Sequence, residues 1–167
     1  HLGATVATTT SAGNMALVKR LGADVVIDYK QAAFEERLNG YDVVLNSQDG
    51  KTLAKSLGVL QPGGHLISIS GPPDPQFAED IKAPWFVKQV MRALSWGTRR
   101  QAQRRKVSYT FLFMKASGSQ LRQITPLIES GAIRPVIDKV FPFESTNEAM
   151  AYVESGRAKG KVVITVR

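Results

Sequence analysis

Hydroxyl and amide side chains are concentrated where the first apolar run of the chain, 4–9, comes to an end. Thr9, Ser11 and Asn14 stand there, no Asp or Glu stands with them, and Tyr29 follows the second apolar run. In a dinucleotide-binding fold an acid at this point binds the ribose 2′-hydroxyl, whereas hydroxyl groups leave room for a 2′-phosphate. The pattern therefore favours NADP(H) over NAD. Ser11 is also a common helix cap, and both roles can coexist.

Further apolar runs end in small, polar or Gly-rich residues. Asn46 and Ser47 follow one run, and Ser70 and Gly71 follow another. Ligands of open parallel sheets bind outside the carboxyl ends of the strands, so these ends predict a groove for an extended nucleotide. Turns favour the same residue types in any protein. Each strand end taken alone is therefore also explained without a ligand.

Several reactive patterns are absent from the chain. It contains no G-x-G-x-x-G turn, no Tyr-x-x-x-Lys pair of the short-chain dehydrogenase type and no G-x-S-x-G elbow. There is no Cys, and His1 and His65 are the only imidazoles, so we expect no metal in this chain. His65 lies in an apolar run and is interpreted as structural. No catalytic acid or base is predicted.

Apolar runs alternate with helical patterns, which predicts an α/β fold with a mostly parallel sheet whose strands are buried on both faces. The predicted strands are 4–9, 24–28, 41–46, 64–70 and 107–113. The predicted helices are 13–22, 32–38, 50–58, 77–98 and 118–130.

The regular alternation of apolar runs and helical patterns ends at Gly131. The Pro-interrupted stretch 133–143 is predicted to be extended and to belong to another layer. Ser145 and Glu148 form a capping-box pattern for a helix that runs to Gly156, before a last strand.

The net charge of +8 is concentrated in 82–106. Such a run can bind nucleic acid or an anionic membrane, but it carries no recognised nucleic-acid motif, and we interpret it as a solvated helix face without either partner. Trp85, Phe86, Val90 and Leu94 form a stripe predicted to dock on the chain itself. No signal peptide or membrane span is visible, and with no Cys in the chain a cytoplasmic location is expected.

Four segments resemble a known family: Leu21–Tyr29, Tyr41–Asn46, Ser56–Gly64 and Gly156–Ile164. In order and spacing they are similar to zinc-independent medium-chain dehydrogenases/reductases of the quinone oxidoreductase, or zeta-crystallin-like, branch. The resemblance implies a Rossmann-like doubly wound parallel sheet that lacks its first strand and Gly-rich loop in this chain. It also implies a nucleotide-binding domain at 1–132, and a segment at 133–167 that returns to a GroES-like catalytic domain outside the chain.

The resemblance assigns cofactor contacts residue by residue. The 2′-phosphate is implied at Ser11, Asn14 and Tyr29, the adenosine and ribose at Asn46 and Ser47, the nicotinamide ribose at Ile69, Ser70 and Gly71, and the carboxamide at Phe111, Leu112 and Phe113. Two positions depart from the family pattern. Asn14 stands where a Lys is frequent, which weakens the preference for NADP, and Asn46 stands where an Asp is frequent.

The implied reaction is hydride transfer from NADPH to a quinone or an α,β-unsaturated carbonyl without zinc, with the chain alone expected to be inactive. The strand near 107–113 is implied to pair in a homodimer. An S-adenosylmethionine-dependent methyltransferase is an alternative, because Asp42–Leu45 and Leu60–Leu66 also fit that class. A non-catalytic scaffold that uses 82–106 as its contact surface is another.

Overall fold

The computed structural model describes residues 1–166, which form two compact units. Unit 1 contains residues 1–26 and those from 116 onward, and unit 2 contains Ile27–Lys115. Each unit is described by itself. The domain division predicted at residue 132 stays a prediction.

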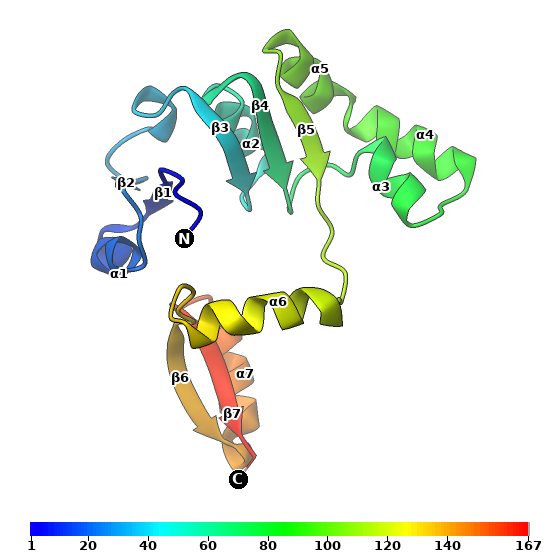
Figure 1. The fold of residues 1–167 in the computed structure, drawn as a ribbon. Coiled ribbons are helices and arrows are strands. Elements are labelled where there is room, and N and C mark those ends of the chain that lie inside the picture. Colours follow the sequence, from blue (N-terminus) through cyan, green and yellow to red (C-terminus); the bar gives the residue numbers. More distant parts are fainter. Residues whose placement is uncertain (167) are drawn as a thin grey trace. The chain divides into compact units, whose positions relative to one another are not determined.

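Unit 2 is built on three parallel strands in the order β3-β4-β5 (Figure 1). They are β3 (Tyr41–Asn46), β4 (Leu60–Ser68) and β5 (Ser108–Phe111), and α2 (Gly50–Ser56) connects the first two. Asn46 lies in register with Ser68, and Ser68 lies in register with Phe111. The carboxyl ends of the three strands are therefore level, as a ligand site at this edge requires.

The core of unit 2 lies on one face of this sheet. Leu53 of α2 and Leu57 at its C-cap pack with Leu60 and Leu66 of β4, and Ala102 and Val107 complete the cluster. Successive strand residues point to opposite faces, and the other face of β3 is open: Val43 is 55% exposed and Leu45 64%. The prediction of strands buried on both faces is wrong for β3, because the helices of unit 2 cover only the face that carries Val44.

Three helices stand in place of the single helix predicted at 77–98: α3 (Pro75–Asp80), α4 (Trp85–Leu94) and α5 (Trp96–Arg104). The break after α3 has a local cause, because Lys82 has a φ of 53° and Pro84 at the N-cap of α4 has no N–H to donate. The helix predicted at 32–38 is a single 3-10 turn, η2 (Phe34–Glu36), since so short a segment does not sustain a helix without a packed face.

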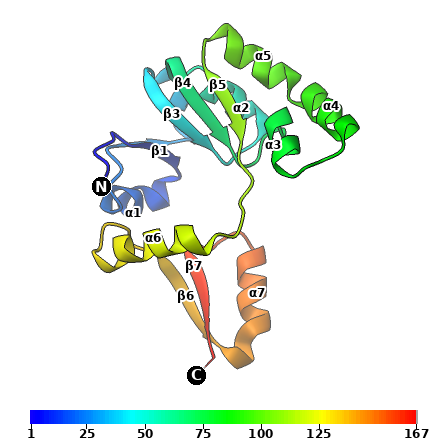
Figure 2. The same cartoon turned by 45° about the vertical axis from the view of Figure 1, so that its right-hand side comes forward.

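Unit 1 begins with β1 (Ala7–Thr10), η1 (Ala12–Asn14) and α1 (Met15–Arg20), and β1 pairs with β2 (Val25–Asp28), in which the boundary between the units falls. It continues with α6 (Gly118–Glu129), β6 (Ile137–Pro142), η3 (Phe143–Ser145), α7 (Thr146–Glu154) and β7 (Lys161–Thr165). Strands β6 and β7 are parallel, and α7 packs along them (Figure 2).

The capping box predicted for α7 does not form. Ser145 occupies the N-cap position with φ −94° and ψ 21°, outside the extended region, and its side chain accepts no capping hydrogen bond. The hydroxyl of Thr146 instead donates to the carbonyl oxygen of Phe143 at 2.5 Å. The 3-10 turn η3 turns the backbone before the α-helix begins, so the cap geometry is lost.

The strands belong to three separate sheets rather than one. Among residues 1–166, no helix has the length and apolar character needed to cross a bilayer.

Candidate functional site

A hydrogen-bonded group of polar side chains stands at the carboxyl ends of β3 and β4. Asn46 and Ser68 are buried there, and Ser70 lies in the following loop. The Asn46 Oδ1 atom accepts from the Ser68 hydroxyl at 3.2 Å and lies 3.3 Å from the Ser70 hydroxyl, which also reaches the Gln48 carbonyl oxygen at 2.5 Å. We call Asn46, Ser68 and Ser70 the strand-end rim. It fixes the side chain of Asn46 in one orientation.

The amide nitrogen of Asn46 is the unused donor of this rim. Only 3% of the residue is exposed, and within residues 1–166 its Oδ1 is the side-chain atom that carries the hydrogen bonds. The NH2 group carries two donor hydrogens, and none of the side-chain hydrogen bonds of Asn46 within residues 1–166 uses them. The exposed residues Ser47 and Ile69 flank it. This arrangement can donate a hydrogen bond to an oxygen of a ligand at the sheet edge.

Ser68 also shapes the loop after β4. Its Oγ atom accepts from the backbone N–H of Gly71 at 2.8 Å and from that of Ser70 at 3.4 Å. A Cβ on Gly71 would lie 2.6 Å from the side chain of Leu53 and 2.7 Å from the Tyr109 hydroxyl. Glycine is therefore needed at 71 for packing within the chain, which is a structural reason beside the predicted cofactor contact.

Tyr109 and Asp74 join this loop to β5, and neither was predicted as a site residue. The Tyr109 hydroxyl donates to the Pro72 carbonyl oxygen at 2.6 Å. Burial, and then the charge of Asp74, raise the pKa of Tyr109 to about 12, so it remains a donor at neutral pH. Asp74 had a recognisable signal, an Asp before Pro at a helix start, whereas Tyr109 is one residue of an apolar run.

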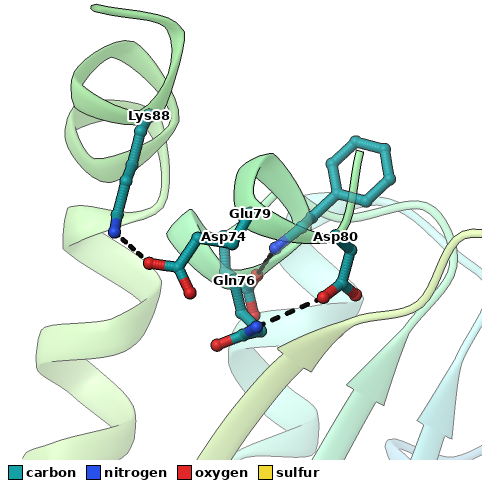
Figure 3. Close-up of polar contacts among 6 residues, drawn as sticks. Asp74, Gln76, Glu79, Asp80 and Lys88 are labelled. Carbon is teal, nitrogen blue, oxygen red and sulfur yellow. Dashed lines mark hydrogen bonds and ion pairs between the residues drawn. The ribbon is translucent and has the colours of Figure 1, made fainter. Parts of the chain in front are cut away.

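The buried carboxylate of Asp74 holds two elements at once. One oxygen accepts from the backbone N–H of Phe77 at 2.9 Å and caps α3, as Figure 3 shows. The other accepts from the backbone N–H of Phe111 in β5 at 3.2 Å. Phe77 lies edge-on to Phe111, with ring centroids 5.1 Å apart, and 5.5 Å from the ring of Phe113. An aromatic cluster thus forms where β5 ends.

The residues predicted to hold a 2′-phosphate fall in different units. Thr9, Ser11 and Asn14 belong to unit 1, and Tyr29 belongs to unit 2. Ser11 occupies the N-cap of η1 without a side-chain capping bond, and the Oδ1 atom of Asn14 is buried without a hydrogen-bond partner in the described chain. Tyr29 is 58% exposed. Their meeting around one phosphate stays a prediction.

The side chains of the strand-end rim can bind and orient a ligand but do not ionise near neutral pH, so they cannot serve as an acid or a base. Asn46, Ser68 and Ser70 are neutral donors and acceptors. His65 is occupied in the sheet, where its Nδ1 lies 2.5 Å from the Ser108 hydroxyl, consistent with its structural interpretation. No cluster of three or more His, Cys, Asp or Glu side chains capable of holding a metal ion occurs in the described part of the chain.

Comparison with known proteins relates the chain to oxidoreductases. The family described as Zinc-binding dehydrogenase matches residues 21–164. A mitochondrial NAD(P)H oxidoreductase of Danio rerio is 32% identical over 98% of this chain and 43% of its own length. A 2-methylene-furan-3-one reductase of Solanum lycopersicum is 32% identical over 95% of this chain and 33% of its own length. The chain spans less than half the length of these relatives.

A solved structure shares the fold. The quinone oxidoreductase from Coxiella burnetii superposes with a TM-score of 0.73 over 98% of this chain and 45% of its own, at 22% sequence identity. Both the sequence match and the superposition extend from the strand-end rim through β6 and β7.

Proposed function

Since this chain belongs to the zinc-binding dehydrogenase family of medium-chain dehydrogenases/reductases, we propose that it is the cofactor-binding part of an NADPH-dependent oxidoreductase. The observation that carries the proposal is the strand-end rim, with the amide of Asn46 free to donate at the carboxyl ends of parallel strands. The family match favours this function over the methyltransferase alternative. The proposed division of the chain remains a nucleotide-binding part at 1–132 and a segment at 133–167 that joins a catalytic domain.

The chain's residues would hold the nicotinamide cofactor, which supplies the hydride when it is bound. Asn46 donates to a ribose hydroxyl, and Ser47 lies beside it. Ile69, Ser70 and Gly71 form the wall next to the nicotinamide ribose. The carboxamide would lie against the backbone of Phe111, Leu112 and Phe113. The N–H groups of Phe111 and Leu112 already donate to the Asp74 carboxylate and the Ser68 carbonyl oxygen, so we propose the N–H of Phe113 as the donor to the carboxamide. The buried linkage through Asp74 keeps the loop and β5 at a fixed spacing.

The choice of NADPH over NADH rests on Ser11, Asn14 and Tyr29, with Thr9 at the strand end beside them. No acid stands among them to repel a phosphate. The amide nitrogen of Asn14 would donate to a phosphate oxygen, whereas its buried, unpartnered Oδ1 can only accept, for instance from a ribose hydroxyl of either nucleotide. The relatives named NAD(P)H oxidoreductase and NADPH-dependent alkenal/one oxidoreductase support this cofactor class.

The test is calorimetric titration of the full-length protein with NADPH, NADH and S-adenosylmethionine. Asn46→Ala should weaken NADPH binding about tenfold, the effect of roughly one hydrogen bond. Asn147→Ala, on the exposed side of α7, is the matched control and should leave the dissociation constant unchanged. Ser11→Ala with Tyr29→Phe should weaken NADPH but not NADH. Equal losses for both nucleotides, or tightest binding of S-adenosylmethionine, would contradict the proposal.

The proposed substrates are quinones or α,β-unsaturated carbonyl compounds, the chemical class of the enone-reducing relatives. The chain itself offers no thiolate and two distant imidazoles, so we propose that hydride transfer proceeds without zinc bound to these residues. Elemental analysis of the active protein should find much less than one zinc per chain. Oxidation of NADPH by a quinone or enone, absent with a saturated ketone, would support the substrate class; binding without turnover would favour the scaffold.

We also propose a homodimer through the strand near 107–113. β5 is an edge strand, and Leu112, Phe113 and Met114 are 50%, 59% and 89% exposed. Met114→Glu should raise the dimer dissociation constant in sedimentation, whereas Met150→Glu in α7 should not. A monomeric wild-type protein would exclude this interface.

A cytoplasmic location is proposed from the absence of Cys. One relative is a mitochondrial protein and another is a chloroplastic protein. Cell fractionation tests the proposal, and recovery of the protein in an organelle fraction would contradict it.

A further inference from the structure

The helices α4 and α5 carry large apolar side chains that no part of the described chain covers. Trp85 is 77% exposed, Phe86 55%, Val90 56%, Leu94 62% and Trp96 58%. The prediction that the stripe of α4 docks on the chain itself is therefore wrong within unit 2. We call these five residues, with the basic side chains between them, the α4–α5 face. In monomeric proteins such an apolar stripe usually faces the core of the protein. Its exposure here therefore indicates a surface that binds a partner.

The outward direction of this stripe is fixed by contacts on the opposite side of α4. Lys88 of α4 forms an ion pair with Glu79 of α3, as Figure 3 shows. The side chains of Val87, Lys88 and Met91 are partly buried, whereas those of Phe86, Val90 and Leu94 are exposed. Phe86, Val90 and Leu94 recur every four residues and so form one line along the helix, away from Lys88.

The charged side chains of residues 82–106 are all positive. Residues 82–106 contain eight basic residues and no Asp or Glu: Lys82, Lys88, Arg92, Arg99, Arg100, Arg104, Arg105 and Lys106. Lys88 is paired with Glu79, and within residues 1–166 the others form no salt bridge. The Arg100 guanidinium lies over the ring of Trp96, 4.9 Å from its centroid. Basic and apolar groups therefore adjoin at Trp96 and Arg100, and further basic residues lie on both helices.

We infer that the α4–α5 face binds the surface of an anionic lipid bilayer. An interfacial helix has Trp, Phe and Leu on one side and Lys and Arg beside them, so that the apolar side enters the headgroup region while the cations meet lipid phosphates. A second copy of this face would bring like charges together. Single-stranded RNA would stack on the two Trp rings but gain little from Val90 and Leu94.

The experiment is sedimentation of the full-length protein with phosphatidylcholine vesicles, with and without phosphatidylserine. Binding should require phosphatidylserine and fall at high salt. Phe86→Ser with Leu94→Ser, and separately Arg100→Gln with Arg104→Gln, should each weaken binding about tenfold or more. Matched controls on other exposed surfaces are Met150→Ser with Val153→Ser, and Lys115→Gln with Arg122→Gln. These controls should bind as the wild type does.

Trp85 and Trp96 are the only tryptophans of the chain, and both belong to this face. Brominated lipid should quench their fluorescence, and Trp85→Phe with Trp96→Phe should remove that quenching. Absence of vesicle binding by the wild type, equal loss in the controls, RNA binding without vesicle binding, or self-association that the Phe86 and Leu94 variant abolishes would each overturn the inference. Cofactor titration is a separate readout, so failure of this surface leaves the proposed function untouched.

Discussion

Gly71 has no side chain, and this allows the loop after β4 to pack closely against the strand-end rim. A Cβ at this position would lie 2.6 Å from Leu53, 2.7 Å from Tyr109 and 2.8 Å from Ser68. We expect Gly71→Ala to lower the free energy of unfolding by about 1–3 kcal/mol, because the neighbours belong to a packed core. Gly97→Ala is the control, since nothing lies within 4 Å of its added Cβ. Denaturant unfolding measures both, and equal effects would contradict the packing explanation.

Tyr109 should make the free energy of unfolding depend on pH in the alkaline range. Its pKa rises from 10.0 to about 12 through burial and the nearby Asp74 carboxylate, so the folded state holds the phenolic proton more tightly. The resulting stability is fully present below pH 10 and is lost as the pH rises through about 12. Tyr109→Phe should be less stable near neutral pH, having lost the bond to Pro72, and should lose less stability over this alkaline range.

The measurement for Tyr109 is denaturant unfolding at a series of pH values between neutrality and pH 12. Tyr29→Phe is a suitable control because its side chain is 58% exposed. If both variants follow the wild-type curve in the alkaline range, Tyr109 titrates as an ordinary phenol and the loop contact contributes little.

At the scale of elements, one carboxylate connects α3 to β5. Asp74 caps α3 through Phe77 and also binds the backbone N–H of Phe111, whereas exposed Asp49 caps α2 through Thr52 alone. Asp74→Ala should cost about 2–3 kcal/mol and Asp49→Ala clearly less, because only the first leaves a second buried donor unpaired. Chemical denaturation compares them. A smaller loss at Asp74 than at Asp49 would show that the link to β5 is weak.

In unit 1 the corresponding connection is between β6 and α7. The Asp138 carboxylate accepts from the Tyr152 hydroxyl at 2.7 Å and the Lys159 backbone N–H at 3.2 Å, and these bonds lower its pKa below the ordinary 3.8. A depressed carboxyl pKa stabilises above pH 3.8 and the gain is lost as the pH falls through the folded value. Asp138→Asn should therefore melt at lower temperature near neutrality and lose less stability in acid than the wild type.

Elements with strong local signals were predictable, and those decided by distant contacts were not. The sequence pattern predicted β3 and α2 closely, since an apolar run and a capped helix need no partner to be recognised. It predicted the polar strand ends, yet Tyr109 and the orientation of Asn46 depend on residues far along the chain. The break in 77–98 followed from Pro84 and was missed because the apolar spacing continues through it.

At the scale of the whole molecule, the chain passes between the two units twice, within β2 and in the segment after β5. Residues 112–116 lie outside helices and strands and are exposed. Local unfolding needs little energy in such a segment, so we expect chymotrypsin to cleave first after Leu112, Phe113 or Met114. Mass spectrometry of early products should find fragments that begin at residue 113, 114 or 115. First cleavage after Phe34 or Tyr152, inside the units, would contradict this order.

The open side of β3 has a consequence for handling the chain. Within unit 2 this strand has a neighbour on one side only, and its Val43 and Leu45 side chains are exposed. A free row of backbone groups beside apolar side chains is a template for adding strands from other molecules. Prepared apart from the remainder of its natural protein, the chain should therefore form insoluble, thioflavin-positive material as its concentration rises, whereas the intact protein should stay clear.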